Sequence, residues 1–148
     1  MEITDYSELG ITIEDHVAVM EIQRPPHNFF DFELISQLSA ACEALGENDA
    51  CRTIVLCAAG KSFCAGANFG DGSGDQHQRD RQTGHLCQEA VRLFRTPKPI
   101  IAAVHGAAIG GGLGLAISAD FRVTCPEARF AANFTRLGFH PGFGLTTT

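Results

Sequence analysis

Hydrophobic and polar positions alternate along residues 11–22, which read ITIEDHVAVMEI. Three consecutive polar residues, Glu14, Asp15 and His16, interrupt the alternation near its middle. A period of two places apolar side chains on one face of a strand, and a short polar interruption is typical of a hairpin turn. The pattern therefore predicts two strands that form a hairpin with one buried face.

The next two periodic segments have helical spacing. In residues 31–46, DFELISQLSAACEALG, apolar side chains recur every three or four positions up to Gly46. Asp31 is placed to cap the first turn, which contains Glu33, so a helix is predicted here. A second helix is predicted over residues 85–95, HLCQEAVRLFR, and the sequence TPKP ends it. The residues expected on one face of this second helix are Leu86, Ala90, Leu93 and Phe94.

Three short segments, residues 53–59, 100–104 and 121–125, are predicted to be buried strands. The first two are continuous apolar runs, which are typical of strands covered on both faces in a parallel sheet. Because these strands alternate with helical patterns, the sequence predicts βαβ units and an α/β fold. The polar, glycine-rich residues 68–84 are predicted to form a loop.

Composition limits the class of protein. The chain has 148 residues, of which 45% are hydrophobic and 19% charged, and this predicts one globular domain over residues 1–148. A formal net charge of -6 argues against nucleic-acid or membrane-surface partners, which would need a basic face. The six cysteines contain no Cys-x-x-Cys spacing and the six histidines no His-Glu-x-x-His spacing, so no metal is expected. Reduced thiols and the lack of an apolar leader favour a cytoplasmic location.

Four glycines stand in residues 107–120, AAIGGGLGLAISAD, where each would cost a helix about 1 kcal/mol relative to alanine. If residues 100–104 are a strand and residues 113–118 a helix, then Gly110, Gly111 and Gly112 form the turn between them. Backbone N–H groups at the start of a helix lack an intrahelical acceptor and attract negative charge. Alternatively, the glycines only allow the helix to pack closely on the sheet.

A second small-residue turn follows another predicted strand, in residues 60–70, GKSFCAGANFG. The amides of this turn, residues 64–67, could point at the same ligand as those of the glycine turn. The sequence Gly60-Lys61-Ser62 raises the alternative of a phosphate-binding P-loop. That motif requires a glycine five residues before Gly60, and the residue there is Val55, which argues strongly against it.

Together, the segments GKSFCAGAN, KPIIAAVHGAAIGGGLGLAISADFRV and ARFAANFTRLGFHPGFG resemble the crotonase (enoyl-CoA hydratase/isomerase) superfamily in order and spacing. The resemblance implies a crotonase-like core, a spiral of ββα units, of which this chain would hold the N-terminal part, without the C-terminal helices that form trimers. It also implies an acyl-CoA thioester as partner. It implies a homo-oligomer, a trimer or dimer of trimers, if those helices exist. No cofactor is expected apart from the coenzyme A of the substrate.

The resemblance further implies an oxyanion hole, in which the backbone N–H groups of Ala67 and Gly111 hold the thioester oxygen and stabilise an enolate. Such donors are commonly a major catalytic contribution. The residues that the resemblance places around the substrate are Arg24, Pro26, His27, Ala65, Gly66, Asn68, Gly110 and Phe134. Of these, Arg24, Pro26 and His27 match the loop, and Ala65 and Gly66 the turn, along which the family binds coenzyme A.

The chain departs from the hydratase pattern at both of its glutamates. The matching positions are Gly114 and Phe134, neither of which can carry a proton, so isomerase or lyase chemistry is favoured over hydration. Gly142 stands where some isomerases have an aspartate. His140 is a candidate proton carrier because of its pKa range, although it could simply be hydrogen-bonded to backbone. The alternative function is an acyl-CoA-binding module without catalysis.

Overall fold

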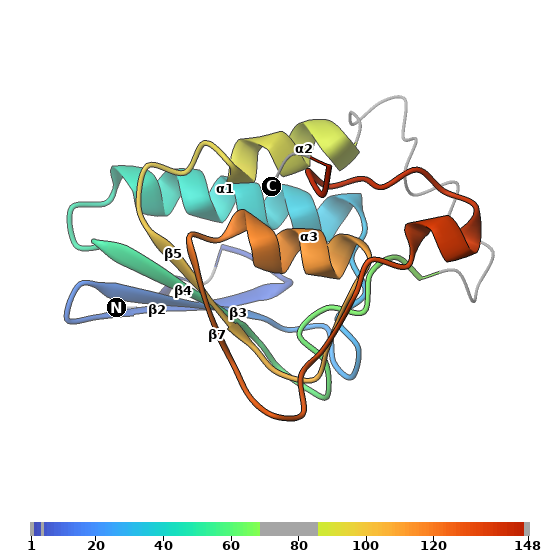
Figure 1. Cartoon of the computed structure of the whole chain (residues 1–148). Coiled ribbons are helices and arrows are strands. Elements are labelled where there is room, and N and C mark those ends of the chain that lie inside the picture. The colour runs from blue at the N-terminus through green and yellow to red at the C-terminus, as the bar shows by residue number, and fades with distance from the viewer. Residues whose placement is uncertain (1, 4, 69–85, 147–148) are drawn as a thin grey trace.

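The computed structural model describes residues 2–3, 5–68 and 86–146. Its centre is a six-stranded sheet with the helices on one face (Figure 1). The helices are α1 (Phe32–Glu47), α2 (Leu86–Leu93) and α3 (Gly111–Ser118). The strands, in their order across the sheet, are β1 (Glu2–Ile3), β2 (Leu9–Glu14), β3 (Val17–Ile22), β4 (Thr53–Ala58), β5 (Ile100–Val104) and β7 (Phe121–Thr124).

The hairpin and the parallel sheet are confirmed. Strands β2 and β3 are antiparallel, with Ile11 opposite Met20 on the buried face. The turn residues Asp15 and His16 have φ angles of 46° and 67°, and two successive left-handed residues match the twist of a tight hairpin. Strands β3, β4, β5 and β7 pair in parallel, as the βαβ pattern predicts.

The helices predicted over residues 31–46 and 85–95 are present. The helix expected over residues 113–118 is also present, but it begins at Gly111, so Gly111 and Gly112 belong to α3 and Gly110 alone precedes it. The side chain of Asp31 accepts a hydrogen bond from Leu34 N at 3.0 Å, so it caps α1 as expected. Helix α2 buries Leu86, Ala90 and Leu93, but it ends at Leu93 and leaves Phe94 42% exposed. The expectation that Phe94 shares the face of Leu86, Ala90 and Leu93 is therefore wrong, because the helix ends at Leu93, before Phe94.

The expectation that the short strands are buried on both faces is also wrong. On β4, Ile54, Leu56 and Ala58 are buried beneath the helices, whereas Val55 and Cys57 on the opposite face are only half-buried. The helices all lie on one face of the sheet, so nothing in the described chain covers the other. On the edge strand β7 this open face leaves Phe121 and Val123 more than 60% exposed.

A second, two-stranded sheet has no counterpart in the sequence patterns. It consists of β6 (Ala107–Ile109) and β8 (Arg129–Ala131), which pair in parallel. A short 3₁₀ helix, η1 (Phe134–Leu137), follows β8. The predicted loop at residues 68–84 lies outside the described residues except for Asn68. Among the described helices, the longest has 16 residues, and none is long and apolar enough to cross a membrane.

Candidate active site

The two small-residue turns predicted from the sequence lie side by side. Cys64 forms an isolated parallel bridge with Ala108, and its amide donates to Ala107 O at 3.0 Å. The Ile109 amide donates in return to Cys64 O, also at 3.0 Å. Gly112 is required at the crossing, because a Cβ there would lie 2.0 Å from Cys64 O. Backbone hydrogen bonds therefore place residues 64–67 against the start of α3.

The amides of Ala67 and Gly111 both border this crossing. Gly111 is the first residue of α3, so its N–H has no intrahelical acceptor. Within the described part of the chain, neither the Ala67 N–H nor the Gly111 N–H donates a hydrogen bond. The turns are also close in space, since a Cβ built on Gly66 would lie only 3.9 Å from Gly111 N. One unpaired donor at a helix start and a second in the neighbouring turn can together stabilise a negatively charged oxygen.

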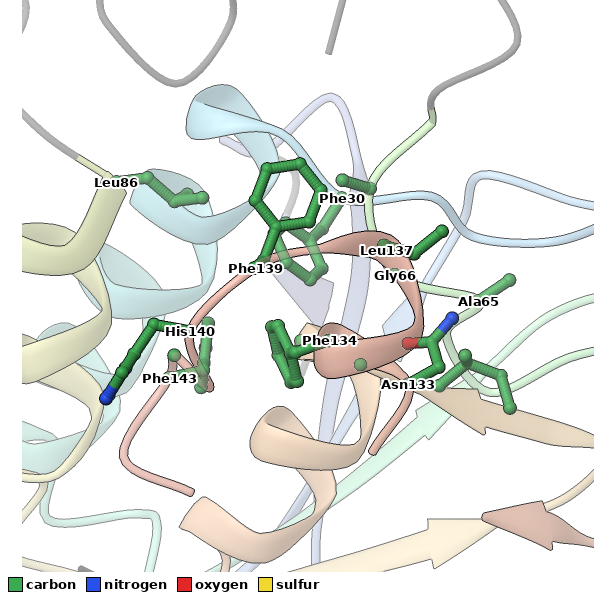
Figure 2. Close-up of a pocket in the computed structure, with 15 residues that line it drawn as sticks. Phe30, Ala65, Gly66, Leu86, Asn133, Phe134, Leu137, Phe139, His140 and Phe143 are labelled. Atoms are coloured by element: carbon green, nitrogen blue, oxygen red, sulfur yellow. The ribbon is translucent and has the colours of Figure 1, made fainter. Parts of the chain in front are cut away.

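An apolar cavity of about 240 Å³ lies in front of these amides, and Figure 2 shows its lining. Four phenylalanines contribute to its wall: Phe30, before α1, and Phe134, Phe139 and Phe143 from the segment after β8. The polar side chains of the lining are Asn133 and His140, and no carboxylate borders the cavity among the described residues. The cavity therefore combines amide donors with aromatic walls.

The structure brings together seven of the residues proposed from the sequence. All seven line the same cavity, and they are Ala65, Gly66, Ala67, Gly110, Gly111, Phe134 and His140. Four proposed substrate-binding residues do not border it: Arg24, Pro26, His27 and Asn68.

Arg24 is part of an ion-pair network rather than a free cation. Its Nε donates to Glu8 and its two terminal nitrogens donate to Phe29 O at 3.0 Å and to Asp31 at 2.8 Å. Partial burial lowers the pKa of Arg24, but the carboxylates of Asp31 and Glu8 outweigh this and raise the pKa above its ordinary value. The guanidinium thus joins β2, the loop after β3 and the start of α1. Its proposed role at the coenzyme A end stays a prediction.

The loop that contains Pro26 and His27 lies along the first small-residue turn. Pro26 O accepts from Lys61 N at 2.9 Å and His27 O accepts from Ala65 N at 3.0 Å. The side chain of Asn28 is fully buried and donates to Ser62 O at 2.7 Å and to Ala59 O. This position agrees with the loop-and-turn pair that the resemblance assigns to coenzyme A, although direct contact with a ligand stays a prediction.

The two positions that the resemblance matches to the glutamates of hydratases have different surroundings. Phe134 lines the cavity, whereas Gly114 lies behind it on α3. A Cβ on Gly114 would lie 2.6 Å from Phe143 Cβ and 2.9 Å from its ring carbon Cδ1. The ring of Phe143 therefore fills the space in which a side chain at position 114 would lie.

His140 lines the cavity from the segment after η1, and it is exposed. Its Nδ1 lies 2.8 Å from Pro141 O. In Figure 2 its ring points away from Phe134 at the centre of the view. A role in proton transfer would require the ring to turn, and it stays a prediction.

The lining residues that were not proposed from the sequence include three phenylalanines, Phe30, Phe139 and Phe143. Phe30 directly precedes the cap of α1, and its ring packs on the start of α3, where a Cβ on Gly111 would lie 2.1 Å from Phe30 Cζ. No periodic pattern marks these positions, because they come from loops. The only feature of the sequence that marked Phe143 was the pair of glycines, Gly142 and Gly144, on either side of it.

The thiol in the first turn is not suited to nucleophilic chemistry. Burial raises the pKa of Cys64 to about 12, so the thiol is protonated near neutral pH. Among the described residues, no three histidine, cysteine, aspartate or glutamate side chains are grouped so that they could hold a metal ion.

Comparison with known proteins agrees with the geometry. The family model described as enoyl-CoA hydratase/isomerase matches residues 12–148. A probable enoyl-CoA hydratase of Mycobacterium tuberculosis is 36% identical over 148 residues, which cover 97% of this chain and 57% of the relative. A probable enoyl-CoA hydratase of Bacillus subtilis is 32% identical over 142 residues, which cover 93% of this chain and 54% of the relative.

Solved structures show the same relationship. The crystal structure of an enoyl-CoA hydratase subunit from Geobacillus kaustophilus superposes with a TM-score of 0.84 at 31% identity, and the match covers 97% of this chain and 56% of that one. The chain belongs to the enoyl-CoA hydratase/isomerase family and has the α/β crotonase fold. It spans a little over half the length of the relatives it matches.

Proposed function

We propose that this chain binds an acyl-CoA thioester and that the amides of Ala67 and Gly111 together hold its carbonyl oxygen. The observation that carries the proposal is the position of two unpaired N–H groups at the wall of one apolar cavity, in a member of this family. Negative charge develops on the thioester oxygen when an enolate forms. Fixed donors stabilise that charge without reorganisation, which is how an oxyanion hole accelerates acyl chemistry.

The reaction that fits the site is an isomerisation or a lyase-type cleavage rather than the addition of water. Hydration in this family depends on the two glutamates whose positions are Gly114 and Phe134 here, and no carboxylate borders the cavity in the described chain. His140 is the proposed proton carrier, because it is the titratable side chain of the described lining. The same lack of carboxylates favours the second candidate, an acyl-CoA-binding module without catalysis.

The remaining assignments follow the same proposal. Arg24, Pro26 and His27 are proposed to lie along the coenzyme A portion, next to the turn that contains Ala65, Gly66, Ala67 and Asn68, while Gly110 supports the second donor. Coenzyme A enters as part of the substrate, and no separate cofactor is proposed. A homo-oligomer is proposed as well, and the exposed Phe121 and Val123 offer apolar surface that association would cover.

A matched pair of substitutions at Gly111 tests the oxyanion hole. Gly111→Ala and Gly111→Pro both add a Cβ where Phe30 Cζ would be 2.1 Å away, so both displace the same ring. Only proline removes the N–H, and proline is well accommodated at the first position of a helix. The difference between the two variants therefore reports on the replacement of the N–H group by the proline ring carbon, with the Cβ effect removed.

The measurement is turnover and calorimetric binding of saturated, 2-enoyl, 3-enoyl and aromatic acyl-CoAs. For an enzyme, the proline variant should turn over about 10²- to 10³-fold more slowly than the alanine variant. A binding module would show no turnover and only a modest loss of affinity. Identical behaviour of the two variants towards every thioester would refute the assignment of Gly111.

A further inference from the structure

Phe143 has a backbone conformation that phenylalanine rarely adopts. Its φ angle is 55°, and it stands between Gly142 and Gly144, the second of which has a φ of 75°. A bulky residue in the left-handed region is strained, and such strain persists only where the surrounding structure holds it and is often found at functional sites. In this structure, the packing of the Phe143 side chain holds the backbone in this conformation.

The side chain of Phe143 packs against two residues near the amide donors, Phe30 and Gly114. Its centroid is 5.8 Å from that of Phe30, with 50° between the ring planes, which is a favourable tilted arrangement. On α3, the side chain covers Gly114 so closely that a Cβ at that position would lie 2.6 Å from Phe143 Cβ. The space of the missing glutamate is therefore filled by an aromatic ring rather than left empty.

Phe143 also forms part of the cavity wall, together with Phe30 and Phe134 (Figure 2). At about 240 Å³ the cavity is smaller than the roughly 300–1,000 Å³ of pockets for drug-sized ligands. A short, compact group fits this space better than a long extended chain. Aromatic walls offer such a group the offset and edge-to-face contacts that favour another aromatic ring.

We propose that Phe143 is a specificity-determining residue, which with Phe30 and Phe134 forms a recess for the aromatic ring of an arylacetyl-type acyl group beside the two amide donors. This inference rests on the proposed function, because it requires an acyl thioester to be held at Ala67 and Gly111. It adds the chemical class of the acyl group and the residue that selects it.

The test compares two thioesters with eight acyl carbons, phenylacetyl-CoA and octanoyl-CoA, with acetyl-CoA as the reference. Each is titrated by calorimetry into the unchanged chain and into Phe143→Leu, which keeps apolar bulk without the ring. The unchanged chain should bind phenylacetyl-CoA about tenfold more tightly than octanoyl-CoA, the effect of one or two ring contacts. Phe143→Leu should lose most of this preference, and its affinity for acetyl-CoA, which has no ring to contact Phe143, should fall by a smaller factor than its affinity for phenylacetyl-CoA.

Phe121→Leu is the matched control, because the Phe121 side chain is 63% exposed on β7 and does not line the cavity. It should keep the full preference. Circular dichroism and thermal unfolding of Phe143→Leu verify that it is folded, and Phe143→Tyr, which restores a ring, should retain a preference for phenylacetyl-CoA.

Three results would overturn the inference: equal affinities of the unchanged chain for the two eight-carbon thioesters, an unaltered preference in Phe143→Leu, or an equal loss for all three ligands. Failure of the proposed function is distinguishable from these. In that case no thioester binds at all, or binding does not differ between Gly111→Ala and Gly111→Pro.

Discussion

The two turns that carry the amide donors and the segment that covers them are held in different ways. Residues 64–67 and 107–112 are joined by reciprocal backbone hydrogen bonds, and glycines stand where any side chain would collide with backbone. Residues 133–145 make local bonds instead, such as Phe139 N to Phe134 O at 2.9 Å. This segment reaches the turns through its aromatic side chains.

The difference separates two tasks within one site. Backbone bonds fix the donors independently of side-chain identity, so the position of the proposed oxyanion hole would be a property of the fold. In the proposed function, side-chain packing would determine which acyl group fits beside the donors and which groups can move protons. On the matching that the resemblance implies, this chain would retain the donor turns while Gly114 and Phe134 stand at both carboxylate positions.

The largest loss of stability is expected from a substitution where the two turns cross. Gly112→Ala would place a Cβ 2.0 Å from Cys64 O and 2.8 Å from Cys64 C. Both of these Cys64 atoms are backbone, so they cannot move aside easily. We expect a loss of about 3 kcal/mol in the free energy of unfolding, measured by denaturant titration. Gly142→Ala is the control, because the nearest atom to its Cβ is Phe134 Cε1 at 3.9 Å, and it should be near neutral. Equal stability of the two variants would contradict the described crossing.

A smaller effect is expected where the covering segment meets α3. Gly114→Glu alone should lower the free energy of unfolding by about 2 kcal/mol, because its Cβ collides with the side chain of Phe143. The double variant Gly114→Glu/Phe143→Gly removes that collision and relieves the left-handed strain, so it should be more stable than the single variant. A double-mutant cycle with Phe143→Gly measures the coupling. Additive effects would show that Phe143 does not fill the space at position 114.

The N-terminal cap of α1 connects the ion-pair network to the aromatic wall. Asp31→Ala removes the hydrogen bond to Leu34 N and the partner of Arg24, next to Phe30. We expect a loss of about 1 kcal/mol in thermal or chemical unfolding, the usual contribution of such a cap. Glu33→Ala in the same turn serves as the control and should cost less. A larger loss in Glu33→Ala would contradict the assigned cap.

The buried thiols of Cys42 and Cys64 are expected to react least at neutral pH. Burial raises the pKa of Cys42 to about 11 and that of Cys64 to about 12. At pH 8 we expect an alkylating reagent to leave both unmodified while it labels the half-buried Cys125, as measured by peptide mass spectrometry. Rapid labelling of Cys64 in the folded chain would contradict its burial in the first turn.

The same thiols give the stability a defined pH dependence. Their pKa values are higher in the folded chain than in the unfolded one, so the folded state favours the protonated thiols. This contribution is fully present below the unfolded pKa of about 8.5 and is lost as the pH rises towards 11 and 12. Unfolding followed from pH 8 to 11 should therefore show decreasing stability. Cys42→Ala should reduce that decrease.

Elements with local signals were predictable from the sequence. The hairpin of β2 and β3 and helix α1 follow from periodicity, a polar turn and the cap at Asp31, all of which act between neighbours in the chain. The donor turns were also predictable, since runs of small residues after buried strands mark close backbone approach. Their matching to Ala67 and Gly111 came from the family resemblance.

Features that depend on distant contacts were not predictable. Strand β6 pairs with β8 and, at Ala108, with Cys64, and no local pattern encodes these contacts between segments that are distant in the chain. Burial of β4 on both faces was wrongly expected because apolar runs do not reveal which face a helix will cover. The ring of Phe143 fills the space at Gly114 through tertiary packing, for which the sequence provided only two flanking glycines.

The most direct test of the central claim is the infrared carbonyl stretch of a bound acyl-CoA labelled with ¹³C at the thioester carbon. Two convergent N–H donors polarise the carbonyl, so the band should lie at lower wavenumber in the complex than in water. It should move back towards the value in water in Gly111→Pro but not in Gly111→Ala. An unshifted band in the complex, or the same band in both variants, would contradict a shared oxygen site at Ala67 and Gly111.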